Sequence, residues 1–140
     1  MRVLIDTCVI LDVLQNREPF FREGERLFLA AANRRFSGFL TAKALTDLYY
    51  ILHKHTHSDP KTRKTLETLL LLFDLLDTAG TDCKLALTSG LSDFEDAVMV
   101  ESAVREKMDG IVTRNLRDYS KARLPVYSPE EFLEKLGVEG

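Results

Sequence analysis

The sequence contains no tryptophan, only two cysteines and no long apolar run. Its longest apolar stretch, LLLLF at residues 69–73, is far shorter than the roughly 20 residues that span a bilayer. Asp6 and Asp12 interrupt the apolar N-terminal segment, and no small-residue cleavage site follows, which argues against a signal peptide. Cys8 and Cys83 lack metal-type spacing. We therefore expect a cytoplasmic protein with reduced thiols and no membrane contact.

Neither sign of charge dominates, because 19 basic residues stand against 22 acidic ones and give a net charge of −3. This balance does not indicate nucleic-acid binding. It does not exclude an enzyme that acts on nucleic acid, since an acidic metal site lowers the total charge. The 45% hydrophobic and 29% charged fractions argue against disorder. A chain of 140 residues predicts a single domain, residues 1–140.

Short apolar segments alternate with longer helical patterns along the chain. We expect strands at residues 2–5, 36–41, within 75–80, within 109–115 and within 124–127. We expect helices at residues 8–16, 17–34, 41–55, 58–76, 81–90, 92 to about 107, and 128–137. This order predicts an α/β fold with a central, mainly parallel sheet of four to five short strands. Sites in such sheets gather beyond the carboxyl ends of the strands.

Several acidic residues lie where such a site is expected. Asp6 directly follows the first strand, although it also suits the N-cap of the next helix. Asp47 lies within ALTDLYYIL, where a solvated helix face shared with Lys43 is an equal alternative. Asp118 lies in TRNLRDY, just after a strand, where a turn built from Asn and Asp is the simpler interpretation.

The stretch GLSDFEDAVMV, residues 90–100, begins a helix with three acids. Ser92 and Glu95 fit an S-x-x-E capping box. Asp93 suits the first helical position, where the helix dipole favours negative charge. Asp96 is not needed for the helix start and borders its apolar face. Asp96 is therefore the residue of this stretch that we expect at a site.

Together these features place four acids, Asp6, Asp47, Asp96 and Asp118, on four separate elements. Converging carboxylates repel one another and raise each other's pKa values unless a cation is present. Mg²⁺ or Mn²⁺ prefers such oxygen ligands. A site of this kind suits phosphodiester hydrolysis by a metal-activated water.

The sequence resembles the PIN-domain family over nearly its whole length. The resemblance rests on VLIDTCVILDVL, TAKALTDLYYIL, DFEDAVMVESA, IVTRNLRDY and LPVYSPEEFL, in this order and separation. It implies a three-layer α/β/α fold, one or two Mg²⁺ or Mn²⁺ ions and cleavage of single-stranded RNA. Many bacterial and archaeal members are VapC-type toxins, usually dimeric and restrained by a small antitoxin protein, so a homodimer and an antitoxin are expected partners.

Carried over by position, the resemblance assigns the family's metal-binding acids to Asp6, Asp96 and Asp118. Asp47 stands where the family most often has Glu, and its shorter side chain favours water-mediated contact. Supporting roles fall on residues beside these acids: Asp93, Asn115, Thr7 and Thr113.

A basic loop follows the fourth expected strand. Arg114, Arg117 and Lys121, with Arg123 nearby, surround Asp118 and suit an RNA backbone, although an ordinary solvated loop is the simpler interpretation for each one. Two other functions remain open. One is a PIN fold that binds RNA or a partner but cleaves poorly. The other is a haloacid-dehalogenase-like phosphatase, which Cys8 disfavours because that chemistry requires Asp two positions after Asp6.

Overall fold

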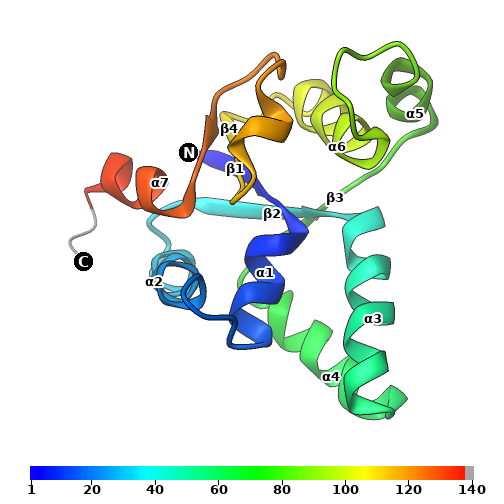
Figure 1. Cartoon of the computed structure of the whole chain (residues 1–140). Coiled ribbons are helices and arrows are strands. Elements are labelled where there is room, and N and C mark those ends of the chain that lie inside the picture. Colours follow the sequence, from blue (N-terminus) through cyan, green and yellow to red (C-terminus); the bar gives the residue numbers. More distant parts are fainter. Residues whose placement is uncertain (138–140) are drawn as a thin grey trace.

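The computed structural model describes residues 1–137, so the last three positions of the expected 1–140 domain lie outside the described residues. Its strands are β1 (Arg2–Ile5), β2 (Ser37–Thr41), β3 (Asp74–Leu76), β4 (Gly110–Val112) and β5 (Val126–Tyr127). They form one sheet in the order β3-β2-β1-β4-β5, and every neighbouring pair is parallel. The expected parallel sheet is therefore confirmed, with β1 at its centre (Figure 1).

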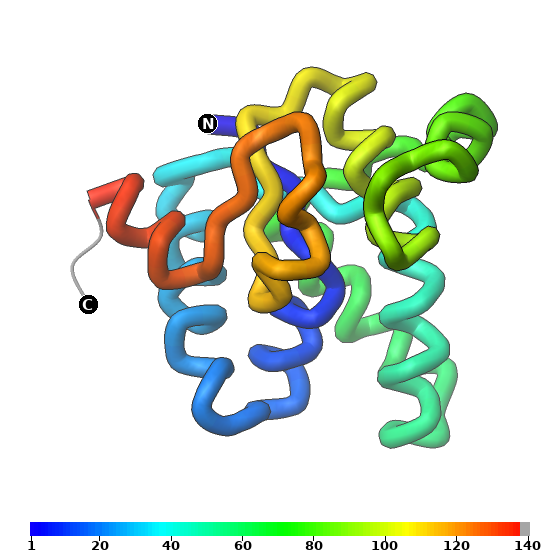
Figure 2. The backbone as a smooth tube through the Cα atoms, turned by 45° about the horizontal axis from the view of Figure 1, so that its top comes forward, coloured from blue at the N-terminus to red at the C-terminus, as the bar shows by residue number. Residues whose placement is uncertain are grey.

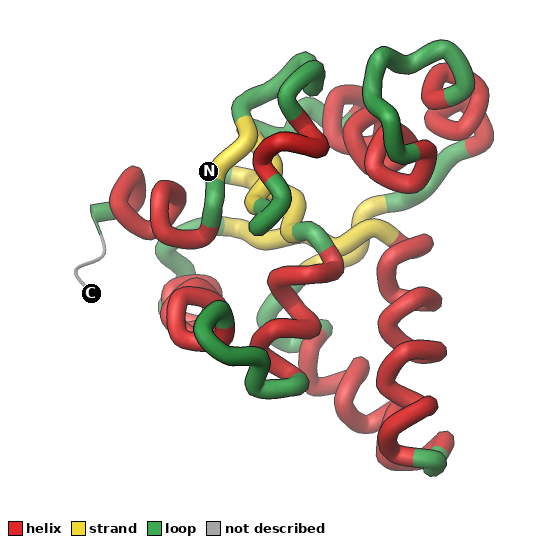
Figure 3. Tube along the Cα trace, viewed as in Figure 1, coloured by secondary structure: helices red, strands yellow, loops and turns green. Residues whose placement is uncertain are grey.

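Helices cover both faces of this sheet (Figure 3). Their bounds are α1 (Thr7–Leu14), α2 (Phe21–Ala32), α3 (Ala42–Thr56), α4 (Asp59–Leu69), α5 (Gly80–Ala86), α6 (Phe94–Arg105) and α7 (Pro129–Leu136). Apolar residues of α1, α2, α3, α4 and α7 form one core cluster with β1. Residues of α6 form a second cluster on the opposite face, where α5 packs against α6. The fold is a three-layer α/β/α sandwich.

The central strand explains the two clusters. Val3 and Ile5 belong to the cluster of the first face, while Leu4 belongs to that of the second face. Successive side chains of a strand point to opposite faces of a sheet, and both faces here are covered. An unbroken apolar run at residues 3–5 is what a buried parallel strand requires.

Three expected boundaries were wrong. The helix expected at 58–76 ends at Leu69, and residues 74–76 form β3 instead. Periodicity alone does not separate helix from strand in the apolar run LLLLFDLL. After the helix ends, Phe73 is buried and packs edge-on against Phe28. Helix α2 begins at Phe21, after Pro19, and α5 ends at Ala86, before Gly90.

The carboxyl ends of β1, β2 and β4 lead into α1, α3 and the 3-10 helix η1 (Leu116–Tyr119). Figure 2 shows the segment that follows β4, in orange, beside the N-terminal β1–α1 segment, in blue. Side chains separated by more than 100 residues in sequence therefore meet at this edge of the sheet. Within residues 1–137, no helix is both long enough and apolar enough to cross a membrane.

Candidate metal-binding active site

Asp6 is buried at the carboxyl end of β1, with 8% of its surface exposed. It occupies the N-cap position of α1, but its side chain makes no capping hydrogen bond. Its Oδ2 instead accepts hydrogen bonds from Thr113 Oγ1 at 2.8 Å and Tyr119 Oη at 3.2 Å. The Cys8 thiol also points at this oxygen, 3.6 Å away. Asp6 therefore stands at the cap position without capping the helix through its side chain, and its carboxylate is fixed by residues from the segment after β4.

Asp96 approaches Asp6 from the first turn of α6. The Tyr119 hydroxyl lies 2.9 Å from Asp96 Oδ1 and 3.2 Å from Asp6 Oδ2. Burial, together with the charges of Asp6 and Asp96, raises the pKa of Tyr119 far above its ordinary value. The phenol therefore stays protonated, and its single proton faces two carboxylates.

The pKa of Asp96 shows that negative charge is concentrated here. Burial raises the pKa of Asp96 to about 6, although the hydrogen bond from Tyr119 lowers it. The charges of Asp6, Asp93 and Asp118 raise this pKa as well. Ionising Asp96 is thus costly in the absence of a cation, which is the electrostatic condition that a bound divalent ion relieves.

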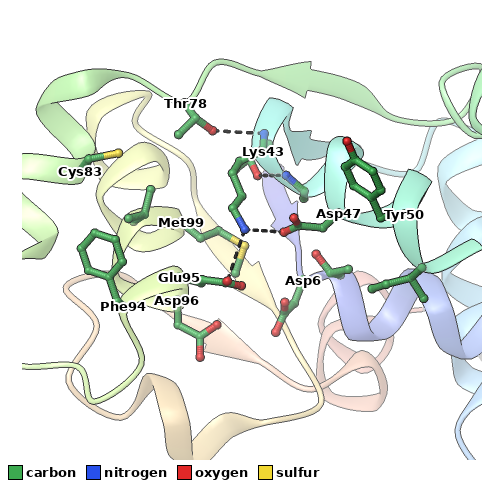
Figure 4. A pocket seen from close by; sticks show the side chains of 15 residues that line it. Asp6, Lys43, Asp47, Tyr50, Thr78, Cys83, Phe94, Glu95, Asp96 and Met99 are labelled. Atoms are coloured by element: carbon green, nitrogen blue, oxygen red, sulfur yellow. Dashed lines mark hydrogen bonds and ion pairs between the residues drawn. The ribbon is translucent and has the colours of Figure 1, made fainter.

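A cavity of about 470 Å³ opens beside these carboxylates. Asp6, Asp96 and Asp47 all line it, from β1, α6 and α3 (Figure 4). Three of the four predicted metal-binding acids therefore share one cavity. The rest of its wall is mostly apolar or hydroxyl-bearing: Thr7, Thr41, Lys43, Ala44, Tyr50, Ile51, Thr78, Cys83, Phe94, Glu95, Val98 and Met99.

Asp47 is held by a lysine one helical turn earlier. Lys43 Nζ lies 2.6 Å from Asp47 Oδ2 and 3.4 Å from Glu95 Oε1. The expected pairing of Asp47 and Lys43 on α3 is present and solvent-exposed, and both residues also line the cavity (Figure 4).

The start of α6 corrects one expectation. Ser92 and Glu95 do not form a capping box, because the helix begins at Phe94 and Asp93 is its N-cap. Asp93 Oδ1 accepts a hydrogen bond from the Asp96 amide at 2.9 Å. Asp93 is therefore the residue that starts the helix, and it fixes the backbone of Asp96. Glu95 is free to reach Lys43 across the cavity.

Comparison with known proteins identifies the family. The family model described as "PIN domain" matches residues 2–117. The chain belongs to the PIN-domain family. Curated proteins give no match.

Solved structures share the fold of this PIN domain at low identity. A toxin–antitoxin complex from Klebsiella pneumoniae has a TM-score of 0.66 and 20% identity, over 91% of this chain and 97% of its own. DNA-bound VapBC from Salmonella typhimurium has a TM-score of 0.67 and 15% identity, over 92% of this chain and 98% of its own. Mycobacterium tuberculosis VapC20, named as a toxin that cleaves the sarcin-ricin loop, has a TM-score of 0.61 and 10% identity. The match covers 78% of this chain and 86% of VapC20.

The remaining predicted residues of the PIN domain lie around this centre. Asp118 is exposed on η1, and its charge contributes to the raised pKa of Asp96. Thr113 is fully buried and also accepts a hydrogen bond from the Asn115 amide at 3.0 Å. Asn115 is exposed with its Nδ2 4.0 Å from Cys8 Sγ, and Thr7 lines the cavity.

The basic residues separate into two groups. Arg114 donates to both oxygens of the buried Asp12, at 2.8 and 3.1 Å, and lies 4.1 Å from the Phe20 ring centroid. Arg123 is similarly engaged by Glu101. Arg117 and Lys121 are exposed. The exposed pair therefore suits an RNA backbone better than the two arginines engaged by buried acids.

The donor chemistry fits a hard divalent cation. Within residues 1–137, no group of three or more His, Cys, Asp or Glu side chains is arranged as a preformed metal site. Asp6 and Asp96 nevertheless present carboxylate oxygens to the same hydroxyl, and both line the cavity. Carboxylates are the ligands that Mg²⁺ and Mn²⁺ prefer, with water completing the coordination.

Sequence reasoning missed three residues of the PIN domain. Tyr119 was not among the expected site residues, yet its hydroxyl joins Asp6 and Asp96. Its position directly after Asp118, a predicted metal-binding acid, could have indicated a place in the site. Lys43 is exposed, as expected for a solvated face, but it was not expected to line the cavity beside Asp47. Asp12, a lone acid inside an apolar helix, was not considered and binds Arg114.

Proposed function

We propose that this PIN domain is a metal-dependent endoribonuclease that cleaves single-stranded RNA with Mg²⁺ or Mn²⁺. The observation that carries the proposal is the convergence of Asp6 and Asp96 on one Tyr119 hydroxyl, at the carboxyl edge of a parallel sheet. Sites of α/β sheets form at this edge. The half-buried Asp96, whose pKa is raised, lies beside the buried Asp6, and such carboxylates cluster at functional sites.

Asp6 and Asp96 would hold the ion, with Asp118 nearby and Asp47 on the other wall of the cavity. When bound, the ion supplies an acidified water and neutralises charge on the phosphate. Thr113 fixes Asp6, and Tyr119 keeps Asp6 and Asp96 turned toward each other. Arg117 and Lys121 attract the RNA backbone to this edge. In-line attack by water then leaves 5′-phosphate and 3′-hydroxyl ends.

The cellular role that we propose is the toxin of a toxin–antitoxin pair. Structures that share this fold over 91–92% of the chain include a toxin–antitoxin complex and a DNA-bound VapBC. A small antitoxin protein and a homodimer are the partners that this role predicts. Co-expression with an adjacent small reading frame should relieve growth arrest and yield a stable complex. Light scattering gives the molar mass of the free protein and so tests for the homodimer.

RNA cleavage in Mn²⁺ tests the activity directly. Labelled single-stranded RNA is incubated with wild type, Asp6→Asn, Asp96→Asn and the matched control Asp74→Asn. Asp74 is exposed at the amino end of β3, at the opposite edge of the sheet. We expect chelator, Asp6→Asn and Asp96→Asn each to abolish cleavage, and Asp74→Asn to cleave as wild type. Cleavage that survives chelator would exclude the metal mechanism. An inactive, well-folded wild type that binds RNA would instead identify a binding module.

A further inference from the structure

Lys43 is placed where helix stability does not favour it. Thr41 caps α3 and accepts a hydrogen bond from the Ala44 amide, which makes Lys43 the second residue of the helix. The positive end of the helix dipole disfavours a cation there. An acid four residues after a lysine is also the weaker orientation of such a pair. Local structure therefore does not explain this lysine.

Tertiary structure gives Lys43 a different setting. Among the described residues that line the cavity, Lys43 is the single basic one, facing Asp6, Asp47, Glu95 and Asp96. Its ammonium lies between α3 and α6, in contact with Asp47 and Glu95 (Figure 4). A lysine ammonium held between two carboxylates carries a positive charge at physiological pH.

The contact also restricts where a metal ion binds. Lys43 Nζ is 2.6 Å from Asp47 Oδ2. An ion on the same carboxylate would lie close to the ammonium, and the two positive charges would repel each other. Asp6 and Asp96 have no basic partner in the described chain and instead share the neutral Tyr119 hydroxyl. The cavity therefore has a side already neutralised by lysine and a side that still needs a cation.

We propose that Lys43 is a built-in cation that takes the position of a second metal ion, so that this chain binds one divalent ion, at Asp6 and Asp96. This inference rests on the proposed metal-dependent function and deepens it. Two-metal phosphodiesterases place ions about 3.5–4 Å apart to neutralise both sides of the reacting phosphate. Here the Lys43 ammonium on the Asp47 side provides the second positive charge.

Mn²⁺ binding without RNA tests the inference independently of activity. Purified full-length wild type, Lys43→Met, Lys43→Arg, Lys43→Met/Asp47→Asn and the control Lys64→Met are titrated with Mn²⁺, and free ion is followed by electron paramagnetic resonance. Lys64 forms an exposed pair with Glu67 on α4, away from the cavity. We expect one ion for wild type, Lys43→Arg and Lys64→Met, and two for Lys43→Met. The double variant should return to one.

RNA cleavage by the same variants separates the two proposals. Lys43→Met should lose about a hundredfold in activity at low Mn²⁺, a usual cost of removing one electrostatic stabiliser, and recover at high Mn²⁺ as the second ion binds. Lys43→Arg, which keeps the positive charge, should lose less activity than Lys43→Met, and Lys64→Met should cleave as wild type. Two ions in wild type, no bound ion, or unchanged binding in a folded Lys43→Met each overturn the inference. One bound ion without RNA cleavage supports the inference and overturns only the proposed function.

Discussion

The Tyr119 hydroxyl lies 2.9 Å from Asp96 Oδ1, and the same hydroxyl reaches Asp6 at 3.2 Å. One phenol proton is therefore the neutral link between a carboxylate at the end of β1 and a carboxylate of α6. The ring of Tyr119 packs in the core cluster beneath α6. Packing thus sets the position of the hydroxyl, and the hydroxyl sets the direction of the two acids.

Tyr119→Phe should separate packing from orientation. The ring remains, so we expect a loss of about 1 kcal/mol in unfolding free energy, the usual worth of one hydrogen bond. RNA cleavage should fall by more, about tenfold or beyond, because the two acids lose their common donor. Urea unfolding and single-turnover cleavage measure the two effects. If cleavage falls only in proportion to unfolding, Tyr119 is merely a packing residue.

Asp96→Asn should stabilise the metal-free protein while abolishing cleavage. The pKa of Asp96 is raised to about 6 by burial and by the charges of Asp6, Asp93 and Asp118. At about pH 8 the carboxylate is ionised at a cost that asparagine avoids. Because Asp96 is half-buried and partly screened, we expect a gain of only about 1 kcal/mol, or 2–4 °C in Tm. Thermal unfolding in EDTA measures it, and Asp74→Asn, at an exposed site, should show no such gain.

Asp82 should make stability depend on pH through the α5–α6 contact. Its carboxylate is 1% exposed and accepts hydrogen bonds from Arg105, Ser102 and the Ala79 amide. Burial by itself raises the pKa of Asp82, but these hydrogen bonds outweigh it and hold the pKa below its ordinary value. The stabilisation is therefore complete above the unfolded pKa, about 4, and is lost as pH falls through the lower folded pKa.

We expect Asp82→Asn to cost about 2–4 kcal/mol at neutral pH, because it leaves Arg105 facing a buried neutral group. The difference from wild type should shrink once pH falls below about 4. Urea unfolding at several pH values measures both effects, with Asp74→Asn as the exposed control. A deficit that stays constant with pH would mean that packing, rather than charge, accounts for the loss.

The basic residues after β4 should differ in whether their removal lowers protein stability or RNA binding. Arg114→Ala leaves Asp12, which is 2% exposed, without its bidentate partner, so we expect a loss of about 3 kcal/mol in stability. Arg117→Ala and Lys121→Ala change exposed side chains and should leave Tm unchanged while weakening RNA binding and its salt dependence. Fluorescence anisotropy with the inactive Asp6→Asn background measures RNA affinity. Equal losses of Tm for all three would contradict this division.

The order of strands and helices could be predicted because hydrophobic pattern and turn chemistry are local. The apolar run at residues 3–5 predicts a strand buried on both faces, and Ser128 with Pro129 starts α7 as expected. Boundaries failed where the pattern is ambiguous, as in LLLLFDLL. At the start of α6, several neighbouring side chains suit the cap, and the path of the incoming chain selected Asp93 over Ser92.

The sequence by itself determined the α/β fold, the parallel sheet and the acids that end up at its carboxyl edge, because strand ends and helix starts follow from nearby residues. Tertiary structure alone decided which groups meet there. Tyr119 joins Asp6 to Asp96, Lys43 holds Asp47, and Arg114 is committed to Asp12. These pairings depend on distance in space between elements as far as 113 residues apart in the chain, and local pattern carries no information about such distances.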